Sequence, residues 1–229
     1  MRVLLFGASG MVGQGVLREC ILSPDVSQVL CVSRRAGSLG LGAGSGKVRE
    51  LVTDNFYDFS SVEPQLAGCD ACFFCLGVSS VGMKEEQYRH ITYDLALAAA
   101  HAILRARPAP SSVTFVYVSG AGTDASSRTM WARVKGETEN ALLAMPFRAA
   151  YMFRPGAIMP MHGIRSKTAF YQAFYSVLAP VMPLLLRAFP RHVNTTEQVG
   201  RAMLHVTREG YTKPILDPSD IAACGSAPA

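Results

Sequence analysis

The sequence predicts an α/β fold built on a doubly wound parallel sheet, and three observations support that prediction. A glycine-rich turn follows the first hydrophobic segment, and apolar segments of strand length then alternate with segments of helical periodicity. Most of the apolar segments also end in small or polar residues. Strands that alternate with helices favour a parallel sheet, whose carboxyl ends bind ligands along one crevice. We therefore expect the functional residues to lie at that edge.

The glycine-rich turn is the most informative segment, because it joins the first expected strand to the first expected helix. Val3 to Phe6 is short and wholly apolar, which predicts a buried strand. Gly7 then allows a tight turn, Gly10 lets the backbone approach a pyrophosphate, and Gly13 lets the helix pack close to the strand. The positive helix N-terminus faces the phosphates. The turn therefore predicts a Rossmann-like dinucleotide site, with a purely structural turn as the alternative.

The remaining elements are expected to alternate along the chain. Further strands are expected over residues 26–32, 48–53, 71–76, 113–118, 149–153 and 214–216. Helices are expected over about 11–21, 60–66, 84–105, 128–143 and 195–208, the last one capped by Asn194 and Glu197. Residues 169–190 are apolar but are interrupted by prolines and by Arg187, so they predict two short helices that cover a pocket or face a partner rather than a membrane span.

Length and composition favour one compact domain with a small appended lobe. The chain has 229 residues, of which 49% are hydrophobic and 17% are charged. We expect a dinucleotide-binding domain over residues 1–156 and a small C-terminal helical substrate lobe over 157–229, packed on the same domain. The net charge of +5 comes without a basic cluster, so we expect a small-molecule substrate and no nucleic acid. The sequence shows no secretory signal, so we expect a cytoplasmic location. We expect the protein to be a monomer or a homodimer.

Three cysteines at regular spacing, Cys69, Cys72 and Cys75, resemble a metal-binding motif. Alternation along the expected strand sends Cys72 and Cys75 to opposite faces of the sheet, and no fourth ligand lies nearby in the sequence. We therefore expect buried free thiols and no metal site.

The end of the second expected strand indicates which dinucleotide is preferred. An acidic residue at this point binds the ribose hydroxyls of NAD, whereas an arginine accommodates the 2′-phosphate of NADP. The chain has no acid here and carries Arg34 and Arg35, whose guanidinium groups suit a phosphate. The sequence therefore predicts NADP rather than NAD, with two solvated loop arginines as the alternative.

Several short motifs carry a resemblance to a known family: Gly7 to Gly13, Cys75-Leu76-Gly77, Tyr117-Val118-Ser119, Lys135-Gly136 and Arg154-Pro155-Gly156. Together they resemble the short-chain dehydrogenase/reductases, specifically the extended or atypical branch with its epimerase-like and Tat-interacting-protein-like members. The resemblance covers about residues 1–160 and implies an NADP-binding reductase or epimerase-like protein. With the two arginines above, the residues expected to bind the cofactor are Gly7, Ser9, Gly10, Met11, Val12, Gly13, Arg34, Arg35, Asp54, Leu76, Gly77, Lys135, Pro155 and Gly156.

The resemblance also implies a catalytic set, and this chain departs from it at one position. Ser119 stands where the family places the serine that polarises the substrate carbonyl, and Lys135 matches the lysine that binds the nicotinamide ribose. The family's tyrosine, four residues before the lysine, is replaced by Trp131. An indole N–H donates a hydrogen bond but has no accessible ionisation, so it cannot pass a proton to an alkoxide. The sequence therefore leaves two hypotheses: an enzyme with weak or unusual activity, or a silent NADP-binding sensor.

His162 is the remaining candidate for a substrate contact. It follows the Pro155-Gly156 motif by a few residues, in the region where the family builds substrate contacts. An ordinary surface histidine is the alternative. His90 and His101 share one face of an expected helix, and we expect them to be packing or exposed residues rather than site residues.

Overall fold

The computed structural model describes residues 1–37, 46–106, 112–164 and 192–226, and it confirms the doubly wound parallel sheet. Seven strands pair in the order β3-β2-β1-β4-β5-β6-β9, and every pairing is parallel. Their bounds are β1 Arg2–Phe6, β2 Gln28–Ser33, β3 Val48–Val52, β4 Ala71–Phe74, β5 Thr114–Val118, β6 Ala149–Phe153 and β9 Ile215–Leu216. The strand order reverses between β1 and β4, which is where ligands bind in open α/β sheets.

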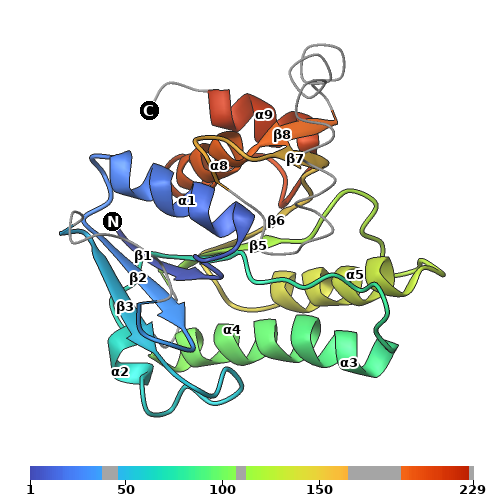
Figure 1. Cartoon of the computed structure of the whole chain (residues 1–229), viewed down its shortest axis with the longest axis horizontal. Coiled ribbons are helices and arrows are strands. Elements are labelled where there is room, and N and C mark those ends of the chain that lie inside the picture. Colours follow the sequence, from blue (N-terminus) through green and yellow to red (C-terminus); the bar gives the residue numbers. More distant parts are fainter. Residues whose placement is uncertain (38–45, 107–111, 165–191, 227–229) are drawn as a thin grey trace.

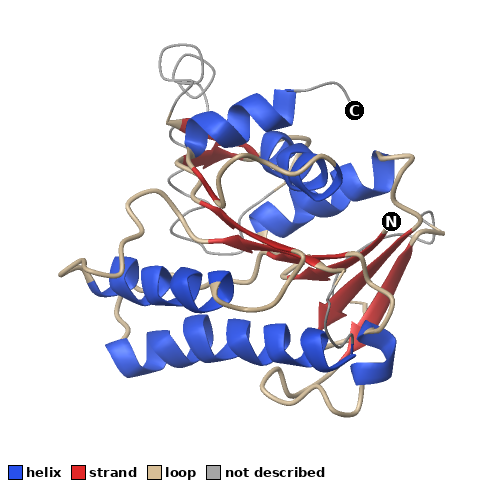
Figure 2. Cartoon of the chain, turned by 180° about the vertical axis from the view of Figure 1, so that it is seen from behind, coloured by secondary structure: helices blue, strands red, loops and turns tan. Residues whose placement is uncertain are grey.

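Helices cover both faces of the sheet (Figures 1 and 2). One face carries α1 Met11–Leu22, α8 Thr196–Arg208 and α9 Pro218–Ser226. The other carries α2 Glu63–Leu66, α3 Glu85–Arg89, α4 Leu95–Ala106 and α5 Met130–Leu143. The helix expected over 84–105 therefore exists, but a π-helical turn, His90–Asp94, separates α3 from α4. Such a turn inserts an extra residue into the helical repeat, which periodicity alone does not reveal.

The hydrophobic core has two layers because successive strand residues point to opposite faces. Leu4 and Phe6 of β1 belong to the layer beneath α4, whereas Val3 and Leu5 belong to the layer beneath α1 and α8. All four side chains are fully buried. These two layers make β1 the centre of the core, so the turn that follows it starts from a rigid strand.

Small residues bring α1 and α8 into close contact on one face of the sheet. A Cβ atom on Gly15 of α1 would lie 2.5 Å from the Cβ atom of Thr196 in α8. A Cβ atom on Gly200 of α8 would lie 2.8 Å from the Cγ atom of Glu19 in α1. Because a real side chain cannot occupy either position without a shift, glycine at both positions sets the helix spacing. Residues far apart in the sequence thereby form one helical layer over β1.

The structure corrects the predicted start of α8 and adds elements that were not expected. The N-cap is Thr195, which forms a capping box with Gln198, so the predicted pair of Asn194 and Glu197 is wrong. Asn194 is instead fully buried, and its amide group bonds Gly156 and Pro218. The unexpected elements are the two-stranded parallel pair β7 Ala157–Met159 and β8 Val193–Thr195, together with α9. The short helices predicted over 169–190 lie outside the described residues.

The cysteines lie as strand alternation predicts: five of the six are buried and Cys75 is partly buried. All six cysteines are free thiols. Cys72 packs into the layer beneath α4 and Cys75 into the opposite layer, as strand alternation requires. No group of three or more potential metal ligands occurs among the described residues, and none of the described helices is long and apolar enough to cross a membrane.

Candidate dinucleotide and catalytic site

The glycine-rich turn has the geometry that its spacing predicts. Gly7 has a positive φ of 78°, and a Cβ atom there would lie 2.8 Å from the backbone of Cys75 and Leu76 at the end of β4. A Cβ atom on Gly13 would lie 2.0 Å from the carbonyl oxygen of Gly7. Both positions therefore require glycine on steric grounds alone. They bring the ends of β1 and β4 together beneath the start of α1.

The same turn leaves open space where a pyrophosphate would bind. Gly10 is the N-cap of α1, and among the described residues no side chain caps the helix. A Cβ atom on Gly10 would approach only the Gly7 carbonyl oxygen, at 3.3 Å, and one on Gly77 would meet nothing within 4 Å. The first N–H groups of a helix, here those of Met11 and Val12, have no intrahelical acceptors. A cradle of open glycines and unpaired N–H groups fits a dinucleotide phosphate.

The ends of β2 and β3 present exposed charged side chains at this edge of the sheet. Arg34 and Arg35 directly follow β2 and are both exposed, and neither guanidinium has a partner within the described ranges. The Ser33 hydroxyl donates to the Arg35 carbonyl oxygen at 3.1 Å, which fixes the backbone of this turn. Asp54 lies exposed two residues after the end of β3. All three charged side chains are therefore available to a ligand.

A buried carboxylate organises the ends of β5 and β6. Glu139 of α5 is 1% exposed and forms a two-nitrogen ion pair with Arg154, whose Nη2 atom lies 2.5 Å from Oε2. The Ser119 hydroxyl lies 2.5 Å from the other carboxylate oxygen and 3.1 Å from the Phe153 carbonyl oxygen. A hydroxyl has a single proton to donate, and a carboxylate is the stronger acceptor. The Ser119 proton is therefore directed at Glu139.

Lys135 lies one helical turn before Glu139 and reaches the end of β5. Its Nζ atom donates to the carbonyl oxygen of Ser119. Burial lowers the pKa of Lys135 from 10.5 to about 8, and the nearby Glu139 carboxylate opposes that shift. Sequence analysis did not single out Glu139. Its spacing of four from Lys135 on one helix face was the available signal.

Trp131 lies one turn before Lys135 and beside the loop that follows β5. A Cβ atom on Gly122 of that loop would lie 3.6 Å from the Cη2 atom of the indole. Two tyrosines on the neighbouring strands do not replace the missing phenol. Tyr117 is fully buried, and the Tyr151 hydroxyl accepts a hydrogen bond from the backbone of Tyr211 at 3.0 Å.

Pro155 and Gly156 form the start of the connection from β6 to β7. The Pro155 carbonyl oxygen accepts from Ala121 at 2.9 Å, which ties this connection to the loop after β5. A Cβ atom on Gly156 would lie 2.0 Å from the carbonyl oxygen of His192, just before β8. The glycine is therefore required for packing of the β7–β8 pair, whether or not a ligand also approaches it.

His162 lies after β7 and has a positive φ of 57°, which is uncommon for a residue other than glycine. Its Nε2 atom lies 3.0 Å from a carboxylate oxygen of Glu197 in α8. That contact lowers the pKa of Glu197. His90 is exposed, stacks on Tyr57 and lies 2.9 Å from Asp94, as an ordinary surface histidine would.

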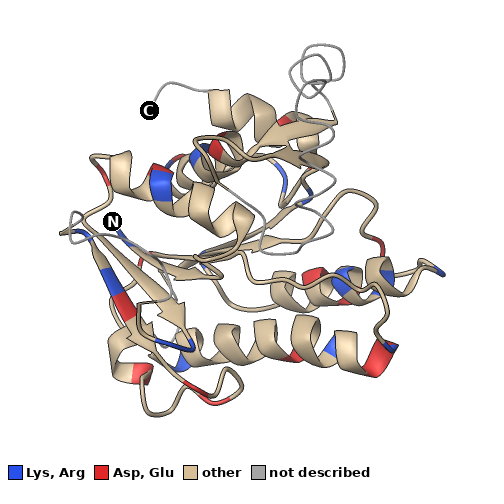
Figure 3. Cartoon of the chain, viewed as in Figure 1, with Lys and Arg blue, Asp and Glu red and all other residues tan. Residues whose placement is uncertain are grey.

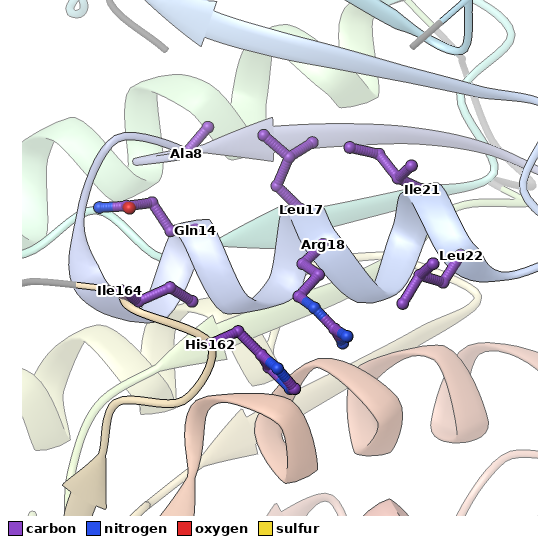
Figure 4. A pocket seen from close by; sticks show the side chains of 8 residues that line it. All are labelled: Ala8, Gln14, Leu17, Arg18, Ile21, Leu22, His162 and Ile164. Carbon is purple, nitrogen blue, oxygen red and sulfur yellow. The ribbon is translucent and has the colours of Figure 1, made fainter. Parts of the chain in front are cut away.

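A separate cavity of about 270 Å³ lies against α1 (Figure 4). None of the residues predicted to bind the cofactor lines it. Its lining consists of Ala8, Gln14, Leu17, Arg18, Ile21, Leu22, His162 and Ile164. Two of its polar side chains already have partners within the chain, since Arg18 pairs with Glu19 and His162 with Glu197.

Residues of both charge signs are interspersed along the described ribbon, without one long run of basic residues, in the view of Figure 3. This distribution is consistent with the expectation of a small-molecule ligand, and the absence of nucleic-acid binding stays a prediction.

Solved structures show the class of fold to which this arrangement belongs. No protein-family model matches the sequence. An oxidoreductase of the short-chain dehydrogenase/reductase family from Burkholderia thailandensis superposes with a TM-score of 0.71 and 18% identity, covering 96% of this chain and 92% of that one. The dTDP-glucose 4,6-dehydratase DesIV from Streptomyces venezuelae, with NAD and TYD bound, superposes with a TM-score of 0.66 and 14% identity, covering 98% and 80%. These two likenesses show that the chain has the fold of the short-chain dehydrogenase/reductases.

Curated relatives give a more specific likeness. The chain is 32% identical over 159 residues to the protein named fmp52, mitochondrial, from Emericella nidulans. The aligned part covers 68% of this chain and 66% of that protein, so the match spans about two thirds of the relative's length. Proteins from Aspergillus fumigatus and Aspergillus niger carry the same name. These names contradict the cytoplasmic location expected from the sequence, and we withdraw that expectation.

Proposed function

We propose that this protein is an atypical NADP-binding reductase or epimerase-like enzyme, in which Trp131 replaces the usual catalytic tyrosine. The observation that carries the proposal is the open cradle between β1 and α1. Gly7 and Gly13 are there for steric reasons, whereas a Cβ atom on Gly77 would meet nothing within 4 Å and one on Gly10 would meet only the Gly7 carbonyl oxygen, at 3.3 Å. A ligand that approaches the backbone closely at both positions explains them.

Different residues around the cradle would bind different parts of the dinucleotide. The N-terminus of α1 would hold the pyrophosphate, with Ser9, Met11 and Val12 beside it, and the two arginines after β2 would hold the 2′-phosphate. By family resemblance, Asp54 would lie near the adenine and Lys135 near the nicotinamide ribose. Leu76, Gly77, Pro155 and Gly156 would line the remaining path. When bound and reduced, such a cofactor supplies a hydride.

A silent NADP sensor is the second candidate, and two observations favour it. Trp131 removes the usual proton donor, and the Ser119 hydroxyl is directed at Glu139 rather than at a substrate. Either candidate binds a small molecule, as a monomer or homodimer. The names of the relatives support a mitochondrial location for this chain.

Calorimetry with NADPH and NADH, followed by a screen of carbonyl compounds for NADPH oxidation, tests both candidates. The enzyme hypothesis expects binding and slow oxidation of at least one class of carbonyl compound. Binding with no oxidation across the screen favours the sensor. Failure to bind either dinucleotide at millimolar concentration overturns both.

A further inference from the structure

We propose that Lys135 is itself the proton donor of this site, with Glu139 as the residue that positions and balances its charge. This inference rests on the proposed function. It starts from the position of the Lys135 ammonium group, which donates one N–H to the Ser119 carbonyl oxygen at the end of β5. An ammonium group has three N–H donors, so two remain for a substrate oxygen or a ribose hydroxyl.

The other donors described around the end of β5 are unsuited to this role. The Trp131 indole does not ionise, and the Ser119 proton is directed at Glu139. The Tyr117 phenol is fully buried, and burial raises its pKa well above the ordinary value. The Tyr151 hydroxyl lies in the opposite core layer, bound to the Tyr211 backbone. Lys135 is the acid that remains among the described groups.

The surroundings of Lys135 give it the acidity that a donor needs. An ordinary lysine is too weak an acid near neutral pH, but burial brings the pKa of Lys135 to about 8, close to a working pH. The charged groups nearby are the Glu139 carboxylate on the same helix and, beyond it, the Arg154 guanidinium at the end of β6. The Asp217 and Asp124 carboxylates in turn help to raise the pKa of Arg154. Glu139 alone favours the protonated amine directly.

Reduction of a carbonyl compound needs one hydride and one proton, and Lys135 would supply the proton. The carbonyl carbon would take the hydride that a bound, reduced nicotinamide dinucleotide supplies, and the π electron pair of the C=O bond would move to the oxygen. That oxygen takes a proton from the Lys135 ammonium group and becomes a hydroxyl. The neutral amine would then regain a proton from water, and the alcohol would leave, with the hydride donor left oxidised.

The titration of Lys135 in the cofactor-free protein tests the assignment without relying on activity. Lys135 is trace-acetylated with acetic anhydride across a range of pH, and the product is quantified by mass spectrometry of the Lys135 peptide. The pH dependence gives the midpoint of the Lys135 titration, with exposed Lys84 as the reference. We expect a midpoint near 8 and a lower midpoint in Glu139→Gln. Glu137→Gln, two residues earlier on α5 and paired with Arg89, should leave it unchanged. A midpoint near 10.5 in the wild-type protein overturns the inference, even if Glu139→Gln fails to fold.

The turnover and the NADPH affinity of the Lys135→Arg variant provide a second test of the inference. Arginine keeps a cation at the site but does not give up its proton. We expect NADPH affinity within a few-fold of wild type and a loss of turnover of about 10²-fold or more. Retained turnover in Lys135→Arg overturns the inference while leaving the proposed function intact. Failure of the wild-type protein to bind NADPH would instead overturn the proposed function, whatever the titration shows.

Discussion

The Ser119 hydroxyl lies 2.5 Å from the buried Glu139 carboxylate, so the serine supports the ion pair of Glu139 with Arg154. We predict that Ser119→Ala lowers the free energy of unfolding by about 1.5–3 kcal/mol, because a hydrogen bond to a buried charge is lost. Ser126→Ala is the matched control, since Ser126 also bonds a carboxylate, Asp124, but at the surface. Its cost should stay below about 0.5 kcal/mol. Equal effects in urea denaturation would contradict this role for Ser119.

Lys135 makes the stability of the protein depend on pH in a defined direction. Its pKa is lowered to about 8 in the folded state, against 10.5 for an ordinary lysine. Below pH 8 both states hold the proton, and the folded state carries the full cost of a buried charge. Between about pH 8 and pH 10.5 the folded state loses the proton first, so this cost falls as the pH rises.

Comparison with the Lys135→Met variant separates the pH-dependent contribution of Lys135 to the free energy of unfolding from the contributions of other titrating groups. Between about pH 7.5 and pH 9.5, the unfolding free energy of wild type should rise relative to the variant by about 2 kcal/mol. Urea denaturation of both proteins at the two pH values measures the change. A difference that does not vary with pH would mean that the folded state does not lower the pKa of Lys135.

Substitutions at two glycines of the glycine-rich turn separate a steric role from a role in ligand binding. A side chain on Gly13 would collide with the Gly7 carbonyl oxygen, whereas one on Gly10 meets it only at 3.3 Å. We predict that Gly13→Ala destabilises the fold by more than about 2 kcal/mol, because backbone must move. Gly10→Ala should change stability by less than about 1 kcal/mol and still abolish dinucleotide binding.

Thermal unfolding and calorimetry measure the two effects separately. Gly46→Ala is the control for substitution at a glycine with open surroundings, since its Cβ atom would meet nothing within 4 Å. It should affect neither property. Undiminished NADPH binding by a folded Gly10→Ala protein would show that the phosphates do not approach this residue.

Arg34 and Arg35 should determine the preference for NADP over NAD. Both side chains are exposed and without described partners, so their substitution should leave the fold intact. The loss of charge-assisted contacts with a phosphate should cost about 1.5–3 kcal/mol of NADP affinity in the double alanine variant, with NAD affinity little changed. Calorimetry of both cofactors checks this, with exposed Arg49→Ala as the control. Equal affinities of the unmutated protein for NADP and NAD would refute the preference.

The fold could be predicted from the sequence further than the site could. Strand alternation and the glycine spacing are local patterns. From them, the bounds of β1 through β6 and of the turn before α1 could be predicted to within a few residues. The N-cap of α8 was missed by one residue because Asn194 and Thr195 are both good caps, and tertiary contacts of Asn194 decided between them. The β7–β8 pair joins three-residue strands more than 30 residues apart, for which no local pattern exists.

The role of Glu139 could not be inferred from local sequence either. Its ion pair with Arg154 spans 15 positions and its bond with Ser119 spans 20, so the cluster exists only once α5 packs against β5 and β6. Sequence analysis placed Ser119 and Arg154 correctly at strand ends. It could not show that the serine hydroxyl is directed at a carboxylate buried between them.

Trp131 decides whether the usual chemistry of the fold is available in this chain. The indole lies beside the loop at Gly122, one helical turn before Lys135, and does not ionise. General acid catalysis is typically worth about 10²–10⁴-fold. We therefore predict that NADPH binds and that its oxidation by generic aldehydes, ketones and quinones is very slow in the wild-type protein.

Replacement of Trp131 by tyrosine should raise that rate, because a phenol one turn from Lys135 provides an ionisable donor beside a cation that lowers its pKa. The increase should be measurable in NADPH oxidation assays and should be accompanied by little change in NADPH affinity. Trp131→Phe is the matched control: it has a similar aromatic ring without the hydroxyl and should remain as slow as the wild type. Rapid turnover by the wild-type protein that Trp131→Phe leaves unchanged would show that position 131 plays no part in proton transfer. An equal gain in both variants would assign the effect to the space vacated by the indole rather than to the phenolic proton.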